Sequence, residues 1–420
     1  MKSKKIKIKK VVNKVADYGF SDILHDHDLV HLLSYFKLRK HKHKNNNTPS
    51  SAELISLLTE LGPGFVEFAR IAASRSDLIP SQYQNNLLNL PYDLQSLERR
   101  SVISILRKEL GKSISKEFIH IDESACHVNL LGGTYQAILQ DGTRVLITVN
   151  SERSIKKFKL NLEQIEFLFD RSLLKLEKQK ALIWKSVIDE LKARSAMVLD
   201  LTNVGAKEEI LSEQFKDSKK IIIPKVFWEY TTPNLLVQEY RNLPDWRDFL
   251  RLKEKSVSSK KYLVRYLLEA FAYQYAKGGH FLLRPRLSNW QIGEKNSIIF
   301  NNFLAIGYLE PEIREVFVEF LRAILESDAN GASKALLKAH YELHNLEEHQ
   351  NTGLSLKKIE GKTVSEKIWF TLESAWQGNL IIPLGISMAA ESILYLENSL
   401  KKFDPEVDLR GSLLSALKTL

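Results

Sequence analysis

The chain has 420 residues, of which 44% are hydrophobic and 27% are charged. This composition is typical of a soluble globular protein with one large or two ordinary domains. Its one cysteine, Cys126, excludes an internal disulfide framework and a multi-cysteine metal site, and we expect this thiol to be buried. Most of the formal net charge of +10 lies in residues 1–44, where 12 Lys and Arg oppose 4 Asp and Glu.

The first predicted segment is a basic arm and linker, residues 1–50. KSKKIKIKKVV lacks an apolar run of signal-peptide length, so we expect no export but a cytoplasmic location, peripheral on the inner face of the cytoplasmic membrane. The lysines can hold the arm on an anionic membrane surface, which is one predicted partner. The alternative is a solvated, fraying tail.

Two further partners of the arm are not expected. Nucleic acid is not expected because no aromatic residue interleaves with the lysines as a stacking surface. In the polar run KHKHKNNNTPSS (40–51), His41 and His43 alternate with lysines, whose repulsion disfavours a metal ion, so we interpret the run as a solvated loop.

Helical periodicity dominates residues 52–116, in SAELISLLTELG and GFVEFARIAASR. Two β-rich runs, TYQAIL and TRVLITV, flank Asp141-Gly142 and predict a hairpin. A long helical stretch over 161–201 follows, and then two strands, KIIIPKVFWEY and NLLVQEY, joined by TTPN. The chain from Trp246 onward is mostly helical, interrupted by FLLRPRLSNW (281–290) and a strand in NSIIFNNF.

The segment NLIIPLGISMAAESILYLENSL is apolar but contains Pro383 and Glu391, so we expect an amphipathic helix packed on a core and no membrane span. The order of elements predicts an α+β protein with a protein-kinase-like bilobal fold, although periodicity alone allows other α+β folds. The predicted domains are the arm (1–50), a helical N-terminal extension (51–128), a kinase-like N-lobe (129–245) and a helical C-lobe (246–420).

Three strings carry a specific resemblance. LGPGFVEFARIAASRSDLIPSQY (61–83) resembles the leader LGPxFxKxGQxxSxRxDxxPxxY of the UbiB/AarF family of atypical kinase-like proteins. IPKVFWEYTTPNLLVQEY resembles that family's strand pair before the hinge. IIPLGISMAAESILYLENSLKKFDPEVDL resembles its terminal helix and its Leu-Asp-Pro ending, here Phe403-Asp404-Pro405. The match runs in order from about residue 12 to 410, so the chain is identified as a divergent member.

The resemblance implies positions for the family's nucleotide site. The signature Lys-x-Gly-Gln falls on a helix at Glu67, Phe68, Ala69 and Arg70, so a cation becomes an anion and an amide becomes a cation. Glu67 and Arg70 are three residues apart and can pair with each other, or an ion pair can form across the former nucleotide cleft. The vestige of the nucleotide loop and hinge is three residues, Gly132, Gly133 and Glu239.

The implied phosphotransfer positions have lost their chemistry. The strand lysine falls on Thr148 and its glutamate partner on Val204. In the catalytic loop HxDxxPGN the aspartate becomes Arg284, and Asn289 is retained; Arg284 and Arg286 either bind an anion or pair with acidic residues of adjoining helices. The metal-binding aspartate falls on Asn302.

Because Mg²⁺ prefers anionic oxygen ligands and a guanidinium cannot act as a base, we expect no catalytic residue, no metal at Asn302 or Asn289, and no cofactor. ATP and Mg²⁺ bound through relocated acidic groups are the alternative. The resemblance implies a pseudokinase-type accessory factor in ubiquinone (isoprenoid quinone) biosynthesis, with proteins or lipids of that pathway as partners. The other hypotheses are a divergent ATPase or atypical kinase, and a lipid- or protein-binding module on a kinase-like scaffold.

Overall fold

The computed structural model describes residues 2–20, 49–75, 78–79, 81–88, 90, 97–111, 114–173, 178–251, 257–301, 305–344, 354 and 356–420. The chain divides into two compact units. The first comprises Met1–Leu97, Val128–Gly133 and Asn150–Ala193, and the second comprises Glu98–His127, Thr134–Val149 and Arg194–Leu420. Two residues of the predicted polar run, His41 and His43, lie outside the described residues.

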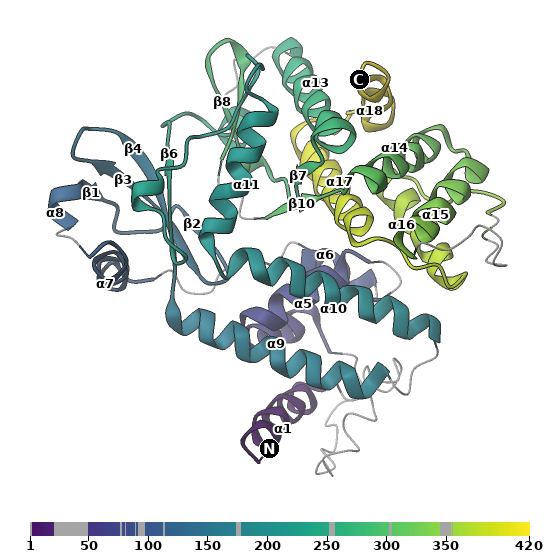
Figure 1. The fold of residues 1–420 in the computed structure, drawn as a ribbon, viewed down its shortest axis with the longest axis horizontal. Helices are drawn as coiled ribbons and strands as arrows, with labels where there is room; N and C mark the ends of the chain where they lie inside the picture. The colour runs from purple at the N-terminus through teal and green to yellow at the C-terminus, as the bar shows by residue number, and fades with distance from the viewer. Residues whose placement is uncertain are drawn as a thin grey trace. The chain divides into compact units, whose positions relative to one another are not determined.

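The first unit is helical (Figure 1). Its elements are α1 (Lys2–Asp17), α4 (Ser51–Leu61), α5 (Pro63–Ala73), α6 (Ser81–Leu88), α9 (Glu152–Leu173) and most of α10 (Lys178–Val198).

The start of the predicted basic arm is a folded helix. The alternative of a solvated tail is wrong for this segment, because Ile8, Val11 and Val12 of α1 are each less than 7% exposed. Lys14 also forms an ion pair with Glu60 of α4. Apolar residues at three- and four-residue spacing therefore bury one face of α1 within its own unit.

The LGPG string at the start of the signature helix has a structural explanation. Gly62 has φ of +125°, which other residues adopt only under strain, and Pro63 occupies the first turn of α5, where no amide donor is needed. A Cβ on Gly64 would lie 2.5 Å from the Cβ of Asn161 in α9. The Asn161 side chain accepts from Gly64 N and donates to Leu61 O, at 3.2 Å each.

The second unit contains a sheet in the order β1-β3-β4-β6, with β2 paired to β3 (Figure 1). The predicted hairpin is confirmed, and Gly142 in its turn has φ of +87°. The strands are β1 (Phe118–Ile121), β2 (His127–Val128), β3 (Gly132–Leu139), β4 (Arg144–Asn150) and β6 (Leu235–Glu239).

Two small sheets and short turns follow, with β5-β9-β8 in one sheet and β10-β7 in the other. Their bounds are β5 (Ile221–Ile222), η1 (Trp228–Tyr230), β7 (His280–Leu282), η3 (Leu287–Asn289), β8 (Trp290–Ile292), η4 (Glu294–Asn296), β9 (Ile298–Phe300) and β10 (Ile306–Tyr308).

The strand predicted in NSIIFNNF is therefore confirmed as β9, whereas KIIIPKVFWEY is only partly a strand. β5 pairs with β9 in parallel, Val226 forms an isolated bridge to Gln238, and residues 228–230 form a 3-10 turn. Pro224 has no amide donor, which explains why the ladder stops there.

The remaining elements of the second unit are helices, and η2 is a π-helical turn that continues α13. They are α7 (Arg99–Leu110), α8 (Ile114–Glu117), α11 (Leu201–Gln214), α12 (Trp246–Arg251), α13 (Val257–Tyr273), η2 (Gln274–Gly278), α14 (Pro311–Glu326), α15 (Ala329–His344), α16 (Val364–Gln377), α17 (Leu384–Phe403) and α18 (Leu409–Lys418).

The apolar segment predicted to be a core helix is α17, and it is buried along most of its length. Phe403 at its end packs on Trp246 with ring centroids 4.3 Å apart, and Trp246 in turn contacts Trp290 at 5.0 Å. The family-like C-terminal string thus anchors a core. Among the helices of the described chain, none is both long and apolar enough to span a membrane.

Candidate functional site

The charged side chains of the signature helix α5 have partners within the first unit. Arg70 is fully buried, donates from Nη2 to the carbonyl O of Leu90 at 2.7 Å, and lies 3.9 Å from Glu67. Ala69, between them, is also buried. The pairing of Glu67 with Arg70 along one helix, one of the two predicted arrangements, is therefore present.

The glycines of the vestigial nucleotide loop begin β3, and both are buried. The Asn129 side chain closes this loop, because its Oδ1 accepts from the backbone N of Leu131 at 2.8 Å and of Gly132 at 2.7 Å. Backbone N–H groups in such loops hold phosphates when they are free. Here a carboxamide oxygen of the chain itself occupies two of these donors.

Thr148, at the position of the implied lysine, is fully buried on β4. Its hydroxyl forms a hydrogen bond of 2.8 Å with the hydroxyl of Thr134 on β3. A neutral pair of hydroxyls thus occupies the place where a phosphate-binding cation is implied.

Val204 on α11, at the position of the implied glutamate, belongs to an apolar cluster with Leu201, Val226 and Leu236. Leu236 lies directly opposite Thr148 in the β4–β6 register, so Thr148 and Val204 have a common neighbour. The two positions of the implied ion pair therefore hold uncharged residues.

A buried carboxyl group that sequence reasoning missed lies one turn further along α11. Glu208 is 1% exposed and its Oε2 accepts from Nε2 of Gln238 at 2.6 Å. Its Oε1 has no hydrogen-bond partner among the residues that the structure describes. Burial raises the pKa of Glu208 well above its usual range, and the Gln238 bond only partly opposes this. The spacing of four residues from Val204 is the signal that could have found it.

The loop FLLRPRLSNW holds a buried ion-pair triad. Nε of Arg284 donates to Oε1 of Glu391 on α17 at 2.7 Å, and Arg194 pairs with both carboxylate oxygens of Glu391. The side chains of Glu391, Arg194 and Arg284 are 0%, 2% and 8% exposed. Pairing of Arg284 with an acidic residue of another helix, one of the two interpretations left open, is therefore present.

One face of α17 fixes the rest of this loop. Ser392 donates to Leu282 O at 2.5 Å, and Ser399 donates to Pro285 O at 2.9 Å. The Tyr395 ring lies under the guanidinium groups of Arg284 and Arg286, at 5.9 and 5.7 Å. Positions 391, 392, 395 and 399 follow the helical repeat, so this stripe of α17 is built to hold the loop.

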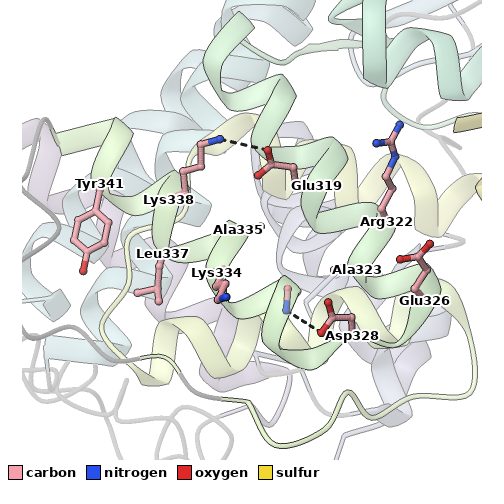
Figure 2. Close-up of a pocket in the computed structure, with 11 residues that line it drawn as sticks. Glu319, Arg322, Ala323, Glu326, Asp328, Lys334, Ala335, Leu337, Lys338 and Tyr341 are labelled. Atoms are coloured by element: carbon pink, nitrogen blue, oxygen red, sulfur yellow. Dashed lines mark hydrogen bonds and ion pairs between the residues drawn. The ribbon is translucent and has the colours of Figure 1, made fainter. Parts of the chain in front are cut away.

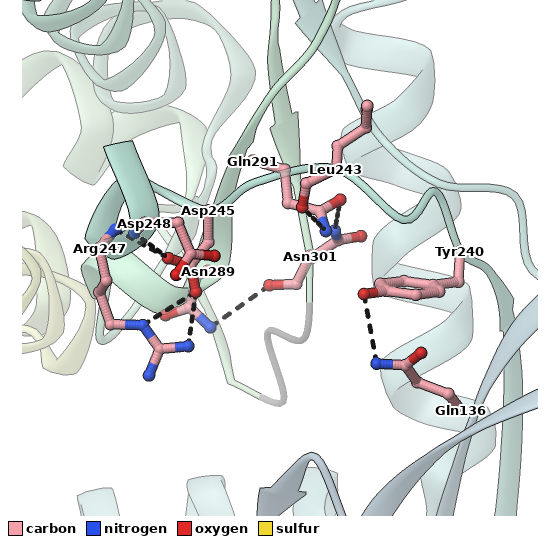
Figure 3. A network of polar contacts seen from close by, with 9 residues as sticks. All are labelled: Gln136, Tyr240, Leu243, Asp245, Arg247, Asp248, Asn289, Gln291 and Asn301. Carbon is pink, nitrogen blue, oxygen red and sulfur yellow. Dashed lines mark hydrogen bonds and ion pairs between the residues drawn. The ribbon is translucent and has the colours of Figure 1, made fainter. Parts of the chain in front are cut away.

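Beyond the loop, carboxamides form a polar network that Figure 3 shows from close by. Asn289 accepts from the backbone N of Arg286 at 3.0 Å and donates to Asn301 O at 3.3 Å. The Asn301 amide donates to Gln291, and Gln291 donates to Leu243 O at 3.0 Å. Asn289 is thus used to tie the loop to the end of β9. Asn302 lies outside the described residues.

Charged groups flank this network on one side (Figure 3). Asp245 caps α12, accepting from the backbone N of Arg247 at 2.8 Å, and it also forms an ion pair with the Arg247 guanidinium. Partial burial and Arg247 lower the pKa of His127 to about 4, while Asp245 opposes the shift. Glu239 accepts from Nε of Arg241 at 3.0 Å.

Cys126, next to His127, is exposed as a residue, which contradicts the prediction that it is buried. Its Sγ is nevertheless shielded from water, since burial raises the pKa of the thiol to about 11. Its Sγ–H donates to the Thr134 carbonyl O at 3.2 Å. Tyr240 receives a hydrogen bond from Gln136 of β3 at 3.3 Å, at the sheet side of the network (Figure 3).

The residues at the implied ATP and Mg²⁺ positions do not fit those groups. Thr148 offers no cation, Val204 no carboxylate and Arg284 no base, and the Asn289 amide is committed to backbone groups. Within the described ranges, no group of three or more His, Cys, Asp or Glu side chains could hold a metal ion. The amides and hydroxyls at these positions hydrogen-bond to one another and to the backbone.

A separate cavity of about 760 Å³ lies between α14 and α15 (Figure 2). Glu319 and Lys338 pair across it at 3.4 Å, and Asp328 caps Gly331 N at 3.0 Å. None of the predicted site residues lines it.

A family model described as "ABC1 atypical kinase-like domain" matches residues 90–336. Protein ACTIVITY OF BC1 COMPLEX KINASE 8, chloroplastic, of Arabidopsis thaliana is 26% identical over 286 residues, which cover 67% of this chain and 37% of that protein. Probable protein kinase UbiB of Xylella fastidiosa (strain M23) is 22% identical over 370 residues, covering 84% of this chain and 66% of that protein.

The chain spans only 37% to 48% of the length of the first three curated relatives. Among solved structures, the complex of Rv3197 with erythromycin from Mycobacterium tuberculosis aligns with 69% of this chain and 73% of that chain, at 17% identity and a TM-score of 0.47.

Proposed function

Because the chain belongs to the ABC1 family of atypical kinase-like proteins, which includes the UbiB/AarF proteins, we propose that it acts without phosphotransfer, as an accessory factor in isoprenoid quinone biosynthesis. The family match also confirms the kinase-like α+β fold expected from the order of elements. The pathway is proposed from the relatives named UbiB. The loss of phosphotransfer is proposed from this chain's own residues.

The observation that carries the proposal is the buried ion pair between Arg284 and Glu391. A phosphotransfer loop needs a carboxylate that accepts the proton of the attacking hydroxyl. Arg284 is a permanent cation, and its contact with Glu391 is part of a buried triad. Moving the Arg284 side chain out of the triad would remove one of the two cations that pair with Glu391. We therefore expect the loop to keep this conformation.

The test is a thermal-shift titration with ATP, with and without Mg²⁺, combined with an assay of ATP hydrolysis and autophosphorylation. We expect no shift of the melting temperature and no turnover above background. Loss of a key charge stabiliser costs on the order of 10³-fold in rate, and groups that act together fail once one is gone. Arg284→Asp alone and Asn302→Asp alone should therefore not restore activity.

The enzymatic alternative is a divergent ATPase or atypical kinase with relocated acidic groups. It predicts robust turnover by the wild-type chain that Asn289→Ala abolishes, and this result would replace our proposal. The role in the pathway has a separate test. Deletion of the gene should lower the quinone content of the cell. Because the proposed role needs no phosphotransfer, a Thr148→Val variant, changed at the position of the implied lysine, should restore the quinone content. If the quinone content is unchanged, a binding module outside quinone metabolism becomes the better explanation.

The proposed location is a membrane surface, reached through the lysines of α1. Electrostatic binding weakens as added salt shortens the Debye length. Sedimentation with anionic vesicles should decrease in high salt, and also after replacement of Lys4, Lys5, Lys7 and Lys9 by alanine. Binding that survives both changes would show that another surface is responsible.

A further inference from the structure

A lysine and a histidine of the second unit lie on neighbouring elements, Lys207 on α11 and His280 on β7. Lys207 extends from α11 to β10, where its ammonium donates to the Ile306 carbonyl O at 3.3 Å and contacts Sδ of Met197 at 3.0 Å. His280 of β7 lies opposite Tyr308 of β10, two residues along from Ile306. The rings of His280 and Tyr308 are in contact, with centroids 4.5 Å apart and planes tilted by 36°.

The carboxylates of the two helices that pack against β7 are engaged elsewhere. On α11 and α17 together there are five, and each has another partner. The pairs are Glu208 with Gln238, Glu209 with Trp228, Glu213 with Lys216, Glu391 with Arg194 and Arg284, and Glu397 with Ser365. Among the described residues, Lys207 therefore has no carboxylate partner.

The other charged groups around this pair are mostly cationic. Lys277 of η2 is exposed, and Arg314 of α14 donates to its carbonyl O at 2.8 Å. Glu310, at the N-cap of α14, is exposed to solvent. Within the part of the chain that the structure describes, the half-buried ammonium of Lys207 and the imidazole of His280 thus form no ion pair with a carboxylate.

The electrostatics agree with this geometry. Burial lowers the pKa of Lys207. Burial and then the charge of Lys207 lower the pKa of His280. An anion bound between them would relieve both effects, because an opposite charge stabilises the protonated forms.

We propose that Lys207, His280 and Tyr308 form a binding site for a small oxyanion, with phosphate as the best match. An ammonium, an imidazolium and a hydroxyl supply three donors of the kind that bind phosphate oxygens. Tyr308 is 41% exposed, so the site is reached from solvent. The same chemistry fits a free phosphate ion and the phosphate group of a small monoester.

The test follows the His280 imidazole by NMR in the full chain, with the signal assigned by its absence in His280→Gln. Inorganic phosphate should raise the pKa of His280, since a ligand that favours the protonated form is itself bound more tightly at low pH. Glycerol phosphate and acetate serve as the monoester and carboxylate arms. Stronger binding of glycerol phosphate would identify a monoester, and stronger binding of acetate would overturn the choice of phosphate.

The matched variants are Lys207→Met and Lys216→Met. Methionine keeps the unbranched stem of lysine and removes only the charge. We expect Lys207→Met to weaken phosphate binding about tenfold or more, the value of one charge-assisted hydrogen bond, and Lys216→Met to leave it unchanged. Equal effects of the two changes, or a His280 pKa that phosphate does not move in the wild-type chain, would overturn the site. Neither result bears on ATP binding, so the proposed function is tested separately.

Discussion

The β4–α11 region and the FLLRPRLSNW loop both lack the groups that the family resemblance implies for a phosphotransfer site, but in different ways. In the first, Thr148 and Val204 are uncharged and rest in a hydroxyl pair and an apolar cluster. In the second, Arg284 brings a charge of the opposite sign, and this charge is buried with Glu391 and Arg194. Thr148 and Val204 are both uncharged and need no counter-ion. The buried guanidinium of Arg284 does need one, and Glu391 of α17 supplies it.

The largest expected effect follows from breaking the triad. Glu391→Gln leaves two buried guanidinium groups without their shared carboxylate, and we expect a loss of about 3–5 kcal/mol in the free energy of unfolding. Urea denaturation measures it, with Asn398→Ala at an exposed position of α17 as the control. A loss below about 1 kcal/mol, the usual value for an exposed pair, would mean that the triad is solvated.

The next prediction concerns the introduction of a lysine at position 148 and a glutamate at position 204. Thr148→Lys alone places an ammonium on a buried face beside Leu236 and should be strongly destabilising. Adding Val204→Glu supplies a carboxylate partner for the lysine, because position 204 also adjoins Leu236. We expect a favourable coupling energy of about 1–3 kcal/mol in the double-mutant cycle. Additive losses would show that the two positions are too far apart to pair.

The pH dependence of stability tests the buried carboxyl of Glu208. Its pKa is raised in the folded state, so the native protein keeps a proton that the unfolded chain releases. The contribution of Glu208 to stability should therefore be greatest below the unfolded pKa of Glu and fall as the pH rises toward the folded pKa, by up to about 1.4 kcal/mol per pH unit. Glu208→Gln should remove this slope. An unchanged slope in the variant would assign the effect to other groups.

The sequence predicted the parts of this comparison that depend on local patterns. The Asp141-Gly142 turn, the strand at β9 and the core helix α17 follow from turn chemistry and periodicity, and the family-like strings gave the kinase-like fold. The contacts of Arg284 were open because Glu391 is 107 residues away in the chain. Glu208 was missed because a residue-by-residue match pointed to Val204, although both lie on one side of α11. Only tertiary packing shows that the Glu208 carboxyl is buried and bonded to Gln238.

The smallest effect concerns the hydroxyl pair itself. Thr134→Val leaves the buried Thr148 hydroxyl without the partner it has in the wild-type chain. We expect each single valine variant to lose about 1 kcal/mol, and the double variant to lose little more than either single change, because two apolar groups of the same shape leave no unmet hydrogen bond. Thermal melts of the four proteins give the coupling energy. If the losses were additive, each hydroxyl would be stabilised by separate contacts. The hydroxyls of Thr134 and Thr148 would then not act as an interdependent pair.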